Sequence, residues 1–321
     1  MNRRSLLLAA PALALPATTR AQGAFPDRPI RVIIGYPAGG GTDVVGRPIM
    51  TRLSEHLGVP VVVENRAGAN GNIAMEHMTR VEPDGHTLFM GDAGNLGITH
   101  ALYPSLPFDT QRDFVGVAQL TAGPVVLVIG GGVPAQNLAE WTALLKSRPE
   151  AFNFGSAGVG SGPHLFYESW RRAAGVSMTH VPYRGTGPAL VGLLAGDVHM
   201  MIGNYGVFRG AHEAGRVKVL AISTPTRHPN LPDIPTVREA GTDWGVIGFN
   251  GIIAPRRIAP ERRQRLEDGF RHVMSQPEMR EQMHGFGSLV DFAPGAELDR
   301  RMAAERESWT RLVREANIQP E

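Results

Sequence analysis

Cysteine is absent from this chain of 321 residues. Disulfide bridges are therefore excluded, and the stability of the folded protein must come from a hydrophobic core. About 300 residues remain when the N-terminal segment described below is set aside, which is long for a single core. We therefore expect two folded lobes.

The chain also lacks an excess of charge of either sign. It has 32 basic residues against 30 acidic ones, and its first 21 residues hold three arginines and no acid. Without that segment the counts are 29 and 30. Because nucleic-acid binding and polybasic attachment to membranes both depend on positive charge, we expect neither kind of partner.

A hydrophobic run long enough to cross a bilayer is missing as well. The N-terminal stretch has an apolar core from Leu6 to Leu15, about half of the roughly 20 residues that a spanning helix needs. Two arginines precede this core and small residues follow it up to Ala21, as in a cleavable export signal. We expect residues 1–21 to be a signal peptide for the Sec or twin-arginine route. The exported protein then has no segment that inserts into a membrane.

Motifs for the common catalytic and cofactor sites are incomplete. The G-x-G-x-x-G pattern of dinucleotide-binding folds fails because Val44 stands where the third glycine is needed, although Glu64 imitates the acid that binds ribose. The G-x-S-x-G pattern of hydrolases fails at Ser156 and Ser161, which lack the glycine two residues earlier. The histidines show no spacing typical of a metal site. We expect no catalytic residue, no cofactor and no metal.

Short apolar runs, each followed by a Gly-rich turn and an amphipathic segment, recur along the chain. Examples are IRVIIG at 30–35, HTLFMG at 86–91 and VVLVIG at 125–130. This alternation predicts an α/β fold with mainly parallel sheets flanked by helices. Pro48 falls within the first turns of the helix that we expect from Val45 to Leu57, where it should remove one backbone hydrogen bond or shift the helix start.

Three Gly-rich loops, at 36–43, 155–164 and 182–188, follow predicted strands and precede predicted helices. Loops of this kind meet at the carboxyl ends of the strands, where ligands of open α/β sheets bind. Exposed backbone N–H groups and the partial positive charge of a helix N-terminus suit an anion. Alternatively, the glycines only permit tight turns, and polar side chains such as Asp43 cap the helices.

Two further residues in these loops allow two interpretations each. His164 either contacts a ligand or serves as a structural donor in the first turn of its helix. Arg184 either clamps a carboxylate or braces its own loop.

Sequence segments over residues 26–241 resemble, in order, the Bug-type (TctC-like) periplasmic solute-binding receptors of tripartite tricarboxylate transporters. The segments are PDRPIRVIIGYPAGGGTD, VPVVVENRAGANG, PDGHTLFMG, LYPSLPFDTQRDF, FNFGSAGVGSGPH, HVPYRGTGPAL, LLAGDVHMM, RVKVLAIST and LPDIPTVREAG. The resemblance implies a two-lobed, Venus flytrap fold that closes on an organic acid. From the restart of the strand-turn-helix pattern and the extended apolar run at 246–255, we place the crossings between the lobes near Thr121–Pro124 and near Val246–Pro255. The first lobe is then expected to hold residues 22–122 plus 250–321, and the second lobe residues 123–249.

The resemblance also implies a binding site between the lobes. The first-lobe loop would meet the ligand through ordered waters, while the loops at Ser156–Ser161 and Arg184–Thr186 would grip a carboxylate. The residues expected to bind the ligand are Tyr36, Gly39, Gly40, Thr42, Asp43, Ala93, Ser156, Gly160, Ser161, His164, Arg184, Gly185, Thr186 and Asn204. Three positions depart from the family pattern, namely Ala38, Pro48 and His199, and His199 could alter the sheet end near the cleft.

The predicted function is therefore that of a periplasmic, monomeric receptor for a small organic acid. The resemblance to this family implies that the membrane subunits of a transporter are its partners. Dicarboxylates, tricarboxylates, acidic amino acids and aromatic acids all stay open as ligands. The alternative is an exported α/β enzyme that binds a phosphate or a dinucleotide at the Gly-rich loops.

Overall fold

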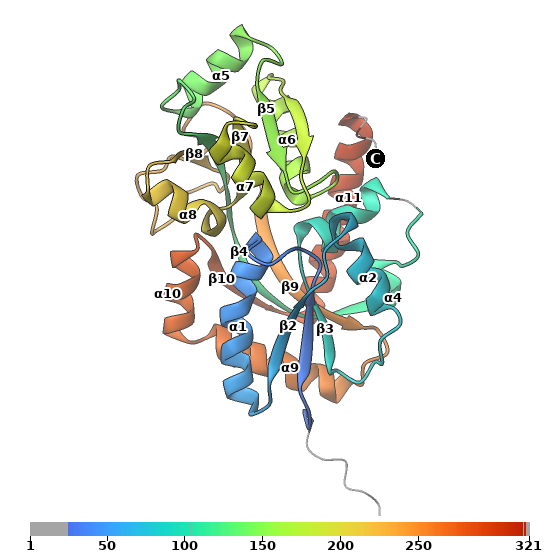
Figure 1. Cartoon of the computed structure of the whole chain (residues 1–321). Coiled ribbons are helices and arrows are strands. Elements are labelled where there is room, and N and C mark those ends of the chain that lie inside the picture. The colour runs from blue at the N-terminus through green and yellow to red at the C-terminus, as the bar shows by residue number, and fades with distance from the viewer. Residues whose placement is uncertain (1–24, 104, 317, 319–321) are drawn as a thin grey trace, which may run out of the picture.

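The computed structural model describes residues 25–103, 105–316 and 318, and the predicted signal peptide lies outside the described residues. The chain forms two α/β lobes joined by two long strands (Figure 1). In Figure 1 the lower lobe holds the N-terminal elements and the orange C-terminal helices, and the upper lobe holds the green and yellow elements between them.

The first-lobe sheet has the strand order β2-β1-β3-β9-β4, with β10 on the other side of β4. Its strands are β1 (Ile30–Ile34), β2 (Val61–Asn65), β3 (Thr87–Asp92), β4 (Phe114–Gly130), β9 (Ile247–Pro255) and β10 (Leu289–Pro294). β1 pairs in parallel with β2 and β3, while β9 and β10 run antiparallel to their neighbours. The strands β1 and β3 are almost wholly buried apolar runs, as expected for strands covered on both faces.

The second-lobe sheet is built on the last third of β4. It adds β5 (Asn153–Ser156), β6 (Thr179–Pro182), β7 (Met200–Asn204) and β8 (Val217–Ile222). β7 and β8 both pair antiparallel with β4, and β5 pairs in parallel with β6 and β7.

The strand β4 crosses from one lobe to the other, and all of its 17 residues are buried. It pairs with β9 up to Pro124 and with β7 from Val125 onward. The boundaries predicted at 122/123 and 249/250 fall inside β4 and β9, and the division of the chain into lobes at those positions is our proposal.

Helices cover both sheets. They are α1 (Gly41–Leu57), α2 (Asn72–Met78), α3 (Thr99–Leu102), α4 (Thr110–Asp113), α5 (Leu138–Ser147), α6 (Gly162–Ala174), α7 (Thr186–Ala195), α8 (Tyr205–Glu213), α9 (Pro260–Met274), α10 (Pro277–Gly285) and α11 (Gly295–Ala316), with short helical turns η1 (Ala69–Gly71) and η2 (Gly94–Ile98). The C-terminal helices return to the first lobe, where α9 packs against α1 and α11 packs against β4.

The α/β class and the two-lobed architecture agree with the prediction, but the sheets are mixed. Four pairings among the described strands are parallel and five are antiparallel. All five antiparallel pairings involve β4 or β9, the strands that cross between the lobes, whereas the pairings among the other strands are parallel. Pro48 does not delay the helix, because α1 begins at Gly41 and contains it. Because proline has no backbone N–H, α1 lacks the hydrogen bond that residue 48 would otherwise donate to the carbonyl of Val44.

Candidate functional site

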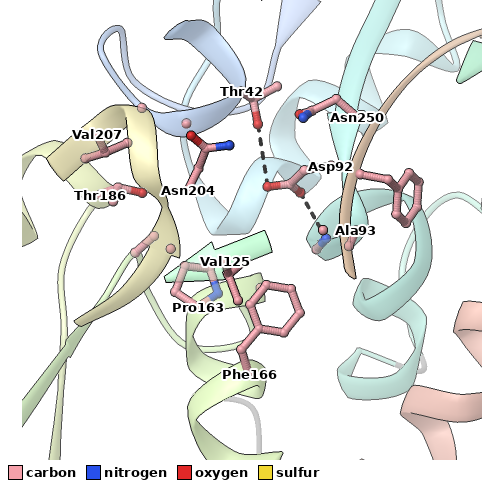
Figure 2. Close-up of a pocket in the computed structure, with 18 of the residues that line it drawn as sticks. Thr42, Asp92, Ala93, Val125, Pro163, Phe166, Thr186, Asn204, Val207 and Asn250 are labelled. Carbon is pink, nitrogen blue, oxygen red and sulfur yellow. Dashed lines mark hydrogen bonds between the residues drawn. The ribbon is translucent and has the colours of Figure 1, made fainter. Parts of the chain in front are cut away.

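A cavity lies between the two lobes, beside the crossing strands (Figure 2). Loops from both lobes, the middle of β4 and the first half of β9 form its walls. The lining residues are Tyr36, Gly40, Gly41, Thr42, Asp92, Ala93, Gly94, Gly123, Pro124, Val125, Ala157, Gly162, Pro163, Phe166, Thr186, Gly203, Asn204, Val207, Gly248, Phe249, Asn250 and Ser288.

Four helices begin at this cavity. The first residues of α1, α6 and α7 line it, and so does Asn204, the N-cap residue of α8. At Gly40 and Gly185, which precede α1 and α7, no side chain caps the helix. The first N–H groups of a helix have no partner within the helix, and they carry a partial positive charge. The cavity therefore attracts anions.

Basic side chains play no part in that attraction. Among the described residues that line the cavity, none is lysine, arginine or histidine, and the one ionisable carboxyl is Asp92. An anion bound here would be held by backbone N–H groups, hydroxyls and amides.

The loop between β1 and α1 is held by a network around Asp43. The buried carboxylate of Asp43 accepts hydrogen bonds from the backbone N–H of Gly39 (3.0 Å), from Asn65 Nδ2 (2.9 Å) and from Arg47 Nε (2.9 Å). The expectation that Asp43 is the N-cap is wrong, because Gly40 holds that position and Asp43 is the third residue of α1. Asp43 instead reaches back to the loop and fixes its shape, with its side chain turned from the cavity.

We expect Asp43→Ala to lower the free energy of unfolding at pH 7 by about 1–3 kcal/mol, because it leaves buried donors unpaired. Burial alone would raise the pKa of Asp43, but the hydrogen bonds from Arg47, Gly39 and Asn65 hold it below its usual value. The contribution of ionised Asp43 to the free energy of unfolding is therefore present above its unfolded pKa and is lost as the pH falls through its folded pKa. Urea unfolding at pH 7 and pH 3 measures it, with the exposed Asp243→Ala as control. An equal loss of unfolding free energy in Asp43→Ala and Asp243→Ala would contradict the role of Asp43 in holding the loop.

Three residues of the 155–164 loop turn into the second lobe. The Ser156 hydroxyl lies 2.6 Å from His180 Nε2, and the Ser161 hydroxyl donates to the carbonyl of Gly158 (2.7 Å). His164 Nδ1 accepts from the N–H of Gly160 (3.1 Å). Ser156, Ser161 and His164 are buried, and none of them lines the cavity. Their contact with a ligand stays a prediction, and the geometry favours structural roles for them.

Two stacked histidines lie under this loop. The rings of His164 and His180 are 4.0 Å apart and nearly parallel. Burial lowers the pKa of His164 to about 4, and burial followed by the neighbouring His164 lowers the pKa of His180 to about 3. Both rings are neutral at pH 7.

The 182–188 loop contributes Thr186 to the cavity. Arg184 is exposed and lines, with Gly185 and Tyr183, a second hollow that shares Tyr36 and Ala157 with the cavity. Gly185 has a φ of 118°, and a Cβ atom there would lie 2.9 Å from the ring of Pro37 in the first lobe. The two lobes thus touch here, and again where Asn70 Nδ2 donates to the carbonyl of Gly160 (2.8 Å). The molecule is in a closed arrangement.

Six of the fourteen predicted ligand-binding residues line the cavity, and eight do not. The six are Tyr36, Gly40, Thr42, Ala93, Thr186 and Asn204. The eight are Gly39, Asp43, Ser156, Gly160, Ser161, His164, Arg184 and Gly185. His199 directly precedes β7, at the opposite end of that strand from Asn204, and its Nδ1 accepts from the N–H of Asn153 (3.0 Å). The expectation that it alters the sheet near the cleft is wrong.

Sequence reasoning missed three polar residues of the cavity wall, Asp92, Asn250 and Ser288. Asp92 and Asn250 are opposite each other in the antiparallel pairing of β3 with β9. The sequence did carry a signal for Asp92 and Asn250. Asp92 directly follows the apolar run that ends at Gly91, and Asn250 lies within the apolar run 246–255. Such residues need a partner when they are buried.

Neither a metal site nor a membrane span is found in the part of the chain that the structure describes. No group of three or more His, Asp or Glu residues is placed to hold a metal ion there. None of the described helices is long and apolar enough to cross a membrane.

A cavity between two α/β lobes joined by crossing strands defines the class of two-lobed periplasmic binding proteins. The family model described as "Tripartite tricarboxylate transporter family receptor" (TctC) matches residues 45–318, so this chain belongs to that family. Members of this family are periplasmic binding proteins.

Relatives and solved structures agree with this assignment. The UPF0065 protein in the tcbD-tcbE intergenic region of Pseudomonas sp. (strain P51) is 34% identical, over 98% of this chain and 95% of its own length. MatC (Rpa3494) from Rhodopseudomonas palustris with bound malate is 33% identical with a TM-score of 0.84, over 90% of this chain and 100% of that one. R. palustris Rpa4515 with adipate is 29% identical with a TM-score of 0.89, over 92% of this chain and 100% of that one.

Proposed function

We propose that this protein is an exported receptor that captures a small organic carboxylate in the cavity between its lobes and delivers it to the membrane subunits of a tripartite transporter. The observation that carries the proposal is the convergence of four helix N-termini on a cavity lined without basic side chains. Such a site suits a carboxylate group that accepts several short hydrogen bonds.

The energetics of this arrangement are adequate for reversible capture. Hydrogen bonds to a charged acceptor contribute about 1.5–3 kcal/mol each. Three or four of them, less ordering costs of several kcal/mol, leave roughly −7 to −9 kcal/mol, which corresponds to a dissociation constant near micromolar. A transport receptor must release its ligand, and this range permits release.

The relatives support the ligand class. The solved structures with malate and with adipate share the fold over almost all of this chain. Both ligands are dicarboxylic acids of small size. Family membership supports the transporter subunits as partners and export to the periplasm as the location. Export of this chain by the Sec or the twin-arginine route is part of the proposal.

A thermal-shift screen of residues 22–321 against organic acids tests the proposal. An acid at 100 times its dissociation constant adds about 2.7 kcal/mol to the stability of the folded state and raises the melting temperature. Malate, adipate, succinate and aspartate form the first panel, with sodium chloride at matched ionic strength as control. Turnover of a bound acid, or stabilisation by NAD or phosphate but by no acid, would contradict the receptor and favour the enzyme.

A further inference from the structure

One wall of the cavity presents hydrogen-bond acceptors in place of donors. The first oxygen of the Asp92 carboxylate, Oδ1, accepts from the N–H of Gly94 (2.9 Å), the N–H of Asn95 (3.3 Å) and the Tyr36 hydroxyl (3.1 Å). The second, Oδ2, has only the long contact with the Thr42 hydroxyl at 3.5 Å. Figure 2 shows this carboxylate between Thr42 and Ala93 at the cavity wall. Oδ2 can therefore accept from a ligand.

A second acceptor lies beside it. Asn250 is the cross-strand partner of Asp92, and both line the cavity. Its Nδ2 donates to the Thr121 hydroxyl (3.1 Å), whereas its Oδ1 is buried without a hydrogen-bond partner among the described residues. A buried oxygen without a donor costs free energy that a ligand donor would recover.

The cavity is thus polarised. Helix N-termini supply donors from α1, α6, α7 and α8, while Asp92 and Asn250 supply acceptors from β3 and β9. A ligand with carboxylate groups alone would satisfy the donors but would place negative charge or apolar surface against Asp92. No cation from the described lining residues faces Asp92, so a ligand is the available source of a positive partner for this carboxylate.

We propose that the preferred ligand is an amino carboxylate, whose carboxylate faces the helix N-termini and whose ammonium group donates to Asp92 Oδ2 and Asn250 Oδ1. This inference rests on the proposed function and names the ligand class within it. Burial raises the pKa of Asp92, because the charged carboxylate is poorly solvated there. An ammonium partner offsets that loss of solvation.

Three acids with the same four-carbon skeleton test the inference. Succinate has no donor on its chain, malate adds a hydroxyl and aspartate adds an ammonium group. We expect isothermal titration calorimetry at pH 7 to rank the affinities aspartate, malate, succinate, with aspartate about 10- to 100-fold tighter than succinate, the range of one hydrogen bond between charged groups.

The variant Asp92→Asn should reverse the ranking. The two backbone N–H groups of Gly94 and Asn95 would keep the amide oxygen on their side, so the new NH₂ group would face the cavity as a donor. Aspartate should then bind about 10- to 100-fold more weakly, and succinate as tightly or more tightly than in the wild type. Asp268→Asn, exposed on α9 and outside the cavity, is the matched control and should change nothing.

The outcomes separate this inference from the proposed function. Tighter binding of succinate than of aspartate by the wild type, or an unchanged ranking in a folded Asp92→Asn variant, would overturn the inference and leave the carboxylate receptor standing. The wild-type ranking alone decides the matter if the variant does not fold. Failure of every acid to bind the wild type would overturn both.

Discussion

Replacing Gly41 by leucine is expected to weaken the binding of the acid by at least about 100-fold, which equals roughly 3 kcal/mol. Gly41 is the first residue of α1, and a Cβ atom there would lie 3.3 Å from the Cβ of Asn204 and 3.9 Å from Cγ2 of Val207 in the second lobe. The further carbons of leucine would occupy the space in which the two lobes meet. They would hold the lobes apart and crowd the first N–H groups of α1.

The structure offers a matched control for this substitution. Gly210, exposed within α8 and outside the cavity, has open space where its Cβ would stand, so Gly210→Leu adds the same side chain without an obstacle. Calorimetry with the best acid from the screen measures both variants, and circular dichroism verifies that both fold. Wild-type affinity in Gly41→Leu would show that the ligand is not bound between α1 and α8.

Acidification from pH 7.5 to pH 5 is expected to destabilise the ligand-free protein by about 2–4 kcal/mol through His164 and His180, since one unit of pKa is worth about 1.4 kcal/mol. The folded pKa values of about 4 and about 3 lie below the ordinary value of 6.5. Below pH 6.5 the two histidines therefore become protonated in the unfolded chain, whereas in the folded chain they stay neutral until the pH is much lower. Stability is greatest above the unfolded pKa and declines as the pH falls toward the folded values.

The double variant His164→Asn/His180→Gln isolates this contribution. Both replacements keep a polar group near the N–H of Gly160 and the hydroxyl of Ser156, and neither titrates. Urea unfolding of wild type and variant at the two pH values gives the difference directly. A wild type that loses no more stability than the variant would show that the stacked pair does not resist protonation.

The parts of the site that lie on loops after strands could be predicted from the sequence. Glycines at 39–41 after an apolar run, followed by a helical pattern, indicate a helix N-terminus at a sheet edge. The structure places Gly40, Thr42 and Thr186 in the cavity. The position of a glycine-rich turn between a strand and a helix is enough to predict these residues, because the groups expected to face the ligand there are backbone N–H groups.

The direction of individual side chains could not be predicted in the same way. Ser156 ends β5 and Thr186 lies just beyond β6, yet the Ser156 hydroxyl turns into the lobe toward His180, 24 residues away, while Thr186 lines the cavity. Which way a hydroxyl turns depends on partners that only the folded chain brings near. The same holds for Asp92. It forms a polar patch of the cavity wall together with Asn250, which lies on a strand more than 150 residues later in the chain.

The mixed character of the sheets has a similar cause. Apolar runs identify strands, but the direction in which β4 and β9 pair depends on how the chain returns to the first lobe after residue 246. Residues distant in sequence decide that pairing, and alternation of strands and helices describes only the local βαβ units correctly.

A crystal structure of residues 22–321 with a bound acid tests the central claim most directly. We predict a carboxylate group within hydrogen-bonding distance of the backbone N–H groups at the starts of α1 and α7, in the cavity that Thr42, Thr186 and Asn204 line. An acid held elsewhere, for example by Arg184 in the hollow beside Tyr183, with the cavity between the lobes empty, would contradict the account.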